Sequence, residues 1–213
     1  ISITDNSPAS MKSQLVSSSE ESIKVHIMVP GFYTTTVTTP NGEANIISVP
    51  NSLSTAQAGE PNVPMIGVPV MIGDKARMDV RITNAKYMDF ENIEVAPSKC
   101  DFPRTVDPAT VPYTYGKCYS ENAFFPANSA ELYAPYILRD YRGQNIAVHP
   151  FVYNPITKTL RVYYDLTVEM YKVDDNGQNT INSRSSKVVK MDQHYKNVYQ
   201  RHFLNYEAGV AKY

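Results

Sequence analysis

Apolar and polar residues alternate along several stretches of the chain, and this period of two is typical of a β-strand with one buried face. The stretch at 159–172 gives the strongest signal. The apolar faces of the three clearest stretches consist of Ile23, Val25, Ile27 and Val29, of Met78, Val80 and Ile82, and of Leu160, Val162, Tyr164, Leu166, Val168 and Met170. The residues between them, including His26, are predicted to face solvent.

Turn residues separate these stretches and indicate antiparallel hairpins. Pro40-Asn41-Gly42 stands between two β-prone runs, and Asn-Gly favours a tight hairpin turn. Asn154-Pro155 joins residues 145–153 to the stretch at 159–172 in a second, longer hairpin. Pro69 interrupts an apolar run, which is therefore predicted to be an edge or bulged strand.

The two ends of the chain differ from this pattern. Residues 1–20 are polar and aperiodic, so we expect a flexible N-terminal arm. Near the other end, apolar residues recur every three or four positions behind Asp192, which predicts a helix from about 192 to 205. Its stripe consists of Tyr195, Val198, Tyr199, Phe203 and Tyr206. The fold prediction is all-β: a single antiparallel two-sheet β-sandwich over residues 21–213, with a short C-terminal helix.

Composition agrees with a β-rich domain. The chain has 213 residues, enough to bury roughly 70% of its unfolded surface without metals or disulfides. Its 16 tyrosines suit pleated, half-buried surfaces, and its 15 prolines mark turns and edges. The net charge of −1 indicates neither nucleic acid nor an anionic membrane as a partner. The polar, Ser-rich start is typical of an exported protein after signal removal.

The sequence offers little for catalysis or metal binding. It contains no G-x-S-x-G, H-E-x-x-H or Gly-rich phosphate loop, and its four histidines are scattered, so we expect no enzyme, metal site or cofactor. Cys100 and Cys118 are the only cysteines. A disulfide between them would stabilise the fold by about 3 kcal/mol. Two free thiols are the alternative, and the sequence leaves both open.

One segment points to an interaction. Residues 97–112 contain four prolines, which predicts an exposed, extended loop without helix. Arg104 is its only arginine and follows Pro103 directly. A basic side chain on a stiffened, extended segment can lie in a protease cleft as a substrate does. The plainer interpretation is a surface arginine in a connecting loop.

Several runs of residues, all in the same order, resemble the N-terminal propeptide of gingipain-type cysteine peptidases, which are secreted virulence enzymes of oral Bacteroidetes. The resemblance covers roughly residues 23–208 and is strongest to the arginine-specific branch. The runs are 95–99 (VAPSK), 111–116 (VPYTYG), 124–126 (FFP), 135–144 (PYILRDYRGQ), 153–163 (YNPITKTLRVY), 177–181 (GQNTI) and 205–208 (NYEA).

The resemblance implies a β-sandwich prodomain that inhibits its peptidase and assists its folding as an intramolecular chaperone. The partner is then the catalytic domain, which carries the catalytic Cys and His. Localisation would be the periplasm and afterwards the outer surface or the extracellular space. In the arginine-specific branch a basic residue of the inhibitory loop enters the primary specificity pocket. The matching position is Arg104, flanked by Phe102, Pro103 and Thr105, in an inhibitory loop near 97–112.

Two features depart from the family pattern. Cys100 and Cys118 are additions without an assigned purpose. The family's maturation site is an Arg before a Tyr, whereas Lys212 precedes Tyr213 here. Lys212 is the predicted maturation site. Three explanations are open: another protease cleaves there, the specificity of the cognate peptidase differs, or the site was altered to prevent cleavage.

A second hypothesis comes from a different class of function. A β-sandwich with many tyrosines is typical of carbohydrate-binding or surface-adhesion modules, where the rings supply stacking platforms. A glycan binder should show ordered aromatics in a groove. An inhibitor should show a protruding loop at 98–108.

Overall fold

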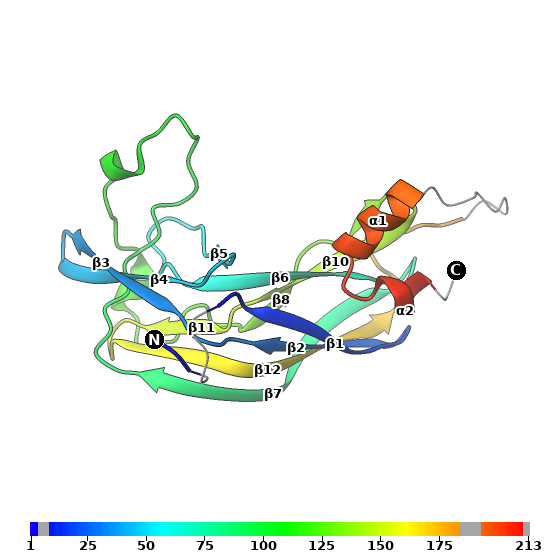
Figure 1. Cartoon of the computed structure of the whole chain (residues 1–213), viewed down its shortest axis with the longest axis horizontal. Helices are drawn as coiled ribbons and strands as arrows, with labels where there is room; N and C mark the ends of the chain where they lie inside the picture. Colours follow the sequence, from blue (N-terminus) through cyan, green and yellow to red (C-terminus); the bar gives the residue numbers. More distant parts are fainter. Residues whose placement is uncertain (4–8, 184–192, 211–213) are drawn as a thin grey trace.

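The computed structural model describes residues 1–3, 9–183 and 193–210 of the chain, and within them two antiparallel sheets face each other (Figure 1). The first sheet contains β1 (Lys12–Ser18), β2 (Ser22–Met28), β7 (Arg77–Phe90), β11 (Phe151–Asn154) and β12 (Thr159–Asp174). The second contains β5 (Leu53–Ser54), β6 (Pro64–Met71), β8 (Ala130–Leu132), β9 (Tyr136–Leu138) and β10 (Tyr141–Val148). The predicted antiparallel, mainly β fold is confirmed.

Strand β12 is the central strand of the first sheet. It pairs with β7 along nearly its whole length, and on its other side with β11 and then β2. Its apolar face meets β6 and β10 of the second sheet in the largest hydrophobic cluster, around Leu166 and Val168. The apolar faces predicted for β2 and β12 are confirmed, except that Tyr164 stays half-buried. Ile82 is 40% exposed, because β7 is an edge strand with a partly covered face.

The prediction of a flexible arm over residues 1–20 is wrong for Lys12–Ser18. These residues form β1, which pairs with β2 and closes the edge of the first sheet. The segment gave no hydrophobic signal because an edge strand needs only backbone hydrogen bonds and a partly buried face. Leu15 provides that face by packing against the main core.

The predicted hairpin arm at 145–153 is wrong as a single strand. The chain leaves β10 of the second sheet at Val148 and enters β11 of the first sheet at Phe151. Pro150 has no N–H to continue a ladder, and its carbonyl instead accepts a hydrogen bond from Tyr163 at 2.8 Å. The hairpin around Asn154-Pro155 is therefore the shorter pair β11–β12.

The other hairpin lies outside the two sheets. β3 (Tyr33–Thr39) and β4 (Gly42–Ser48) form the predicted hairpin, but the loop residues are Pro40 and Asn41 and Thr39 pairs with Gly42, so the turn lies one position before the expected Asn-Gly. The edge-strand prediction for Pro69 agrees with the structure, since β5 pairs only with the first two residues of β6.

The C-terminal helix is shorter than predicted and has a successor. α1 (Gln193–His202) is followed by α2 (Tyr206–Val210), while the expected cap Asp192 lies outside the described residues. Tyr199, Phe203 and Tyr206 of the predicted stripe are buried against Tyr141 and Met71 of the second sheet. Tyr195 and Val198 are exposed instead.

Candidate functional site

The most prominent surface feature is the loop formed by residues 97–116, here named the proline-rich loop. It rises from one end of the second sheet, and α1 rises on the same side at the other end (Figure 1). Most residues between 101 and 112 are exposed, and the only helix there is the single 3₁₀ turn η1 (Pro108–Thr110). The predicted protruding loop is therefore present.

Gly59 holds the base of the loop. Its amide donates a hydrogen bond to the Ser98 carbonyl at 3.0 Å, and its carbonyl accepts one from the Gly116 amide at 2.8 Å. Ser98 in turn donates to the carbonyl of Glu60 at 2.7 Å. Gly59 and Glu60 thus oppose a single residue, Ser98, and Gly59 has a positive φ of 83°, the geometry of a glycine β-bulge. Both ends of the loop are therefore bonded to one residue, Gly59, which lies in the turn between β5 and β6.

The descending limb, residues 106–116, has further anchors below it. The Tyr115 hydroxyl lies 2.8 Å from Thr39 Oγ1 at the end of β3. Tyr119, in the 3₁₀ turn η2 (Lys117–Ser120), donates its hydroxyl to the Val95 carbonyl at 2.8 Å and packs edge-on against Tyr115. Burial raises the pKa of Tyr119, so this hydroxyl stays protonated and keeps donating.

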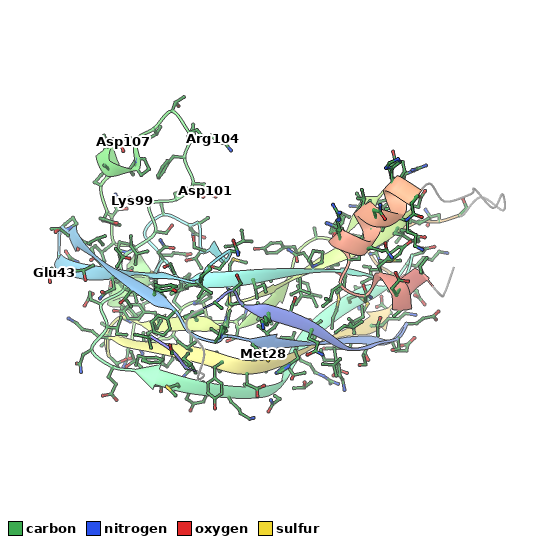
Figure 2. All side chains as sticks on the ribbon, viewed as in Figure 1. Met28, Glu43, Lys99, Asp101, Arg104 and Asp107 are labelled. Carbon is green, nitrogen blue, oxygen red and sulfur yellow. The ribbon has the colours of Figure 1, made fainter. Side chains whose placement is uncertain are left out.

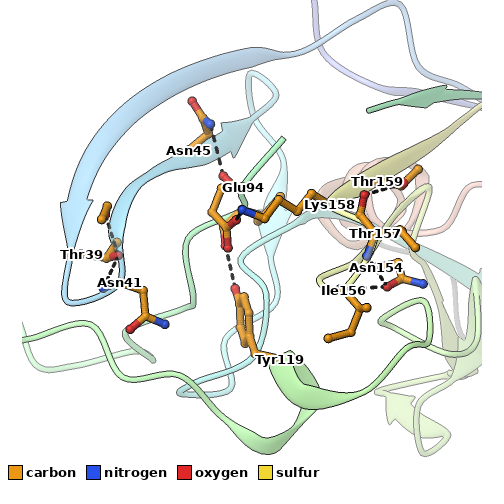
Figure 3. Close-up of polar contacts among 12 residues, drawn as sticks. Thr39, Asn41, Asn45, Glu94, Tyr119, Asn154, Ile156, Thr157, Lys158 and Thr159 are labelled. Atoms are coloured by element: carbon orange, nitrogen blue, oxygen red, sulfur yellow. Dashed lines mark hydrogen bonds and ion pairs between the residues drawn. The ribbon is translucent and has the colours of Figure 1, made fainter. Parts of the chain in front are cut away.

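Glu94 fixes the segment beneath the loop, four residues after the end of β7. Its carboxylate binds Lys158 at 2.9 Å and its carbonyl accepts a hydrogen bond from the Asn45 side chain at 3.2 Å (Figure 3). These contacts connect β4, the segment that follows β7 and the β11–β12 turn, so the loop stands on a rigid platform.

Inside the loop, Lys99 connects the two limbs. Its ammonium donates a hydrogen bond to the Pro108 carbonyl at 2.9 Å and lies 4.1 Å from the centre of the Tyr113 ring. Asp107 caps η1 by accepting a hydrogen bond from the Ala109 amide at 2.9 Å. The loop therefore has internal structure despite its exposure.

Arg104 lies on the side of the loop opposite Asp107, with its side chain exposed (Figure 2). Pro103 and Thr105 are also exposed, while Phe102 is half-buried. The expectation of an extended backbone at Arg104 is wrong. The Val106 amide donates to the Pro103 carbonyl at 2.9 Å, so Arg104 occupies the second position of a β-turn. Pro103 restricts the residue before it, Phe102, to extended backbone, but it places no such restriction on Arg104 after it.

Sequence reasoning missed the residues that position the loop. These residues lie far apart in sequence or have the pattern of ordinary loop residues: Thr39, Gly59, Lys99 and Gly116. The one available signal was the Gly59-Glu60-Pro61 run, whose glycine marks a turn, but nothing local connects it to residue 98 or 116.

The opposite face of the molecule, on β7 and β12, carries aromatic rings and ion pairs. The Arg161 guanidinium lies 4.0 Å from the centre of the Tyr87 ring, and Arg81 lies 5.0 Å from that of Tyr171. The Arg161 guanidinium also binds Asp89 at 2.8 Å and lowers the pKa of that carboxyl. One side of each ring is therefore covered by a cation.

The described residues contain no cluster of three His, Cys, Asp or Glu side chains that could hold a metal ion. Cys100 is an exposed free thiol and Cys118 a half-buried one, whose pKa is raised by burial. Among the same residues, no helix is long and apolar enough to cross a membrane.

Comparison with known sequences gives consistent matches. A family model described as Propeptide_C25 matches residues 7–210. Gingipain R1 of Porphyromonas gingivalis is 35% identical over 197 residues, and gingipain R2 of the same species is 33% identical over 196 residues. Each alignment covers 92% of this chain, but 19% of that gingipain R1 and 26% of gingipain R2. The chain thus spans a fifth to a quarter of the length of these relatives.

Solved structures agree with this result. The complex of Porphyromonas gingivalis RgpB pro- and mature domains contains a chain that superposes with a TM-score of 0.83 at 32% identity, covering 92% of this chain and 97% of that one. A structure described in terms of the zymogenic latency of gingipain K, from the same species, gives a TM-score of 0.66 at 18% identity, covering 81% and 98%. At that identity the second likeness concerns the fold alone.

Proposed function

Because the chain belongs to the Propeptide_C25 family, we propose that it acts as the prodomain of a gingipain-like cysteine peptidase and keeps this enzyme latent. The observation that carries the proposal is the likeness, over 92% of this chain, to a chain of the RgpB pro- and mature-domain complex. The partner is then the cognate catalytic domain, and the prodomain itself hydrolyses no peptide.

The proline-rich loop is the proposed inhibitory element. It protrudes from a rigid base, as an inhibitor that reaches into an active-site cleft requires. Arg104 is the proposed specificity contact, with Phe102, Pro103 and Thr105 beside it. A guanidinium forms short, bidentate hydrogen bonds with a carboxylate, and this geometry matches an arginine-selective pocket. Because Arg104 lies in a β-turn, the loop presents a side chain to the pocket without offering an extended, substrate-like backbone.

The same proposal covers biogenesis. A domain that folds on its own and then binds the catalytic domain lowers the free energy of the folded peptidase, which assists its folding. Export to the periplasm and then to the outer surface or medium follows the gingipain relationship. Lys212, the proposed maturation site, lies outside the described residues.

The glycan-binding alternative has less support. Its rings should form an open groove, whereas guanidinium groups cover Tyr87 and Tyr171 on the aromatic face. Neither ring lines the pocket around Met71 and Lys75 or the one around Leu204 and Glu207.

Titration of the full chain into a mature, arginine-specific cysteine peptidase tests the proposed function. We expect stoichiometric inhibition with a Ki in the nanomolar range, since even a protease–inhibitor interface of standard size binds tightly. Refolding of the denatured peptidase should give more active enzyme when the chain is present. Absence of inhibition at micromolar concentrations would contradict the proposal.

A further inference from the structure

Both limbs of the proline-rich loop are bonded to Gly59, and the second limb contacts it through another glycine, Gly116. Gly59 is buried and Gly116 half-buried, and the Gly116 amide donates to the Gly59 carbonyl at 2.8 Å. On its other side, Gly59 donates to Ser98 at 3.0 Å. The loop thus leaves the sandwich at Ser98 and returns at Gly116, both bonded to Gly59.

Neither glycine has room for a side chain. A Cβ at Gly59 would lie 3.0 Å from the Gly116 nitrogen and 3.2 Å from its Cα, and its φ of 83° already disfavours other residues. A Cβ at Gly116 would lie 2.8 Å from the Gly59 oxygen. These neighbours are backbone atoms, which cannot rotate away. A methyl group at either position therefore separates the two chains and weakens the hydrogen bonds at the base of the loop.

We infer that Gly59 and Gly116 are positioning residues for inhibition, and this inference rests on the proposed function of the loop. They do not touch the enzyme; they fix the loop so that Arg104 is held in its binding position before the partner arrives. A loop that is already ordered loses little conformational freedom on binding, so its contacts contribute more fully to affinity. A loosened loop must be ordered during binding, and its affinity falls.

The test compares inhibition constants of full-length variants against a mature, arginine-specific cysteine peptidase. Gly59→Ala and Gly116→Ala should each weaken inhibition by about ten- to a hundredfold, the range expected when several loop side chains lose their order. In the Arg104→Ala background, Gly59→Ala should weaken inhibition by a smaller factor than in the wild type, since the contribution of an ordered Arg104 side chain is already absent. Such coupling is not expected of a residue that only stabilises the fold.

Gly177→Ala is the matched control. A Cβ there would lie 2.5 Å from the Ala76 oxygen, so the backbone clash is at least as tight, but Gly177 packs against the turn between β6 and β7 and not against the loop. Gly177→Ala should lower the melting temperature and leave the inhibition constant of the folded protein unchanged. Should Gly59→Ala not fold, Tyr115→Phe replaces it. This variant removes only the hydroxyl bonded to Thr39 and should weaken inhibition severalfold through Arg104.

Hydrogen exchange gives an independent readout without the enzyme. Amides of residues 99–115 should exchange faster in Gly59→Ala than in the wild type, and at the wild-type rate in Gly177→Ala. If the wild type does not inhibit, the proposed function fails and this inference with it. If the wild type inhibits and Gly59→Ala or Tyr115→Phe inhibits equally well, only the positioning role is overturned. The same holds if Gly59→Ala weakens inhibition by the same factor in the Arg104→Ala background as in the wild type.

Discussion

A buried guanidinium at the end of the sandwich opposite the loop gives a quantitative test of the packing. Arg142 is 1% exposed, and its side chain donates to the carbonyls of Gly73, Ala76, Gln178 and Asn179 at distances of 2.6–3.2 Å. It thereby connects the turn between β6 and β7 with the segment that follows β12. Arg142→Met keeps the aliphatic stem and removes all of these donors.

The loss can be estimated from the four carbonyls. The Gly73 carbonyl keeps the Ala76 amide as a donor, and water reaches Gln178 and Asn179, which are exposed. A buried acceptor left without a partner costs about 1–3 kcal/mol and a lost hydrogen bond to a charged donor about 1.5–3 kcal/mol, so we expect a total loss of about 3–5 kcal/mol. Urea unfolding followed by circular dichroism measures it, with an unchanged m-value as evidence that the same surface unfolds. The control is Arg201→Met on the exposed face of α1, expected within about 0.5 kcal/mol of the wild type. A loss below about 1 kcal/mol for Arg142→Met would refute this account of the site.

Two further predictions concern the loop and the charged face of the first sheet. Lys99→Met removes the connection to Pro108 and Tyr113 and should weaken inhibition about three- to tenfold with an unchanged melting temperature; an unaffected inhibition constant would show that the loop keeps its shape without it. Arg77 lowers the pKa of Asp174 to about 2, and Arg81 lowers that of Glu169. A carboxylate with a lowered pKa stabilises the fold above its unfolded pKa of about 4, and this contribution is lost as the pH falls toward 2. The melting temperature should therefore decline as the pH is lowered from about 4 to 2. The decline should be less steep in Arg77→Ala.

The sequence predicted those parts of the fold that depend on local patterns. The apolar faces of β2 and β12 follow from alternation because both strands are central in a sheet with one buried face. The hairpin β3–β4 follows from its turn residues. In contrast, β1 has few apolar residues. It pairs with β2 because that edge of the sheet offers unpaired backbone hydrogen-bonding groups, which no local pattern in β1 reveals. The switch between sheets at Pro150 depends on which strand the chain meets next.

The candidate site was predicted only in part, for similar reasons. Four prolines locate an exposed loop, and Arg104 is the one arginine in it, so local sequence suffices for both. The turn at Arg104 depends on a hydrogen bond between Pro103 and Val106 that competes with extended backbone. The anchoring at Gly59 brings together residues about 40 and 57 positions apart, and no local pattern encodes such a contact.

The measurement that tests the central claim most directly is the inhibition constant of Arg104→Ala against a mature, arginine-specific cysteine peptidase, beside those of the wild type and Arg77→Ala. Arg77 lies on edge strand β7 and binds Asp174 on the surface, so its removal should leave inhibition unchanged. Removing one partner of a buried charge pair costs about 2–5 kcal/mol, so Arg104→Ala should inhibit tens- to thousands-fold more weakly while remaining folded. Equal inhibition by the two variants would contradict the account and place the inhibitory contact elsewhere.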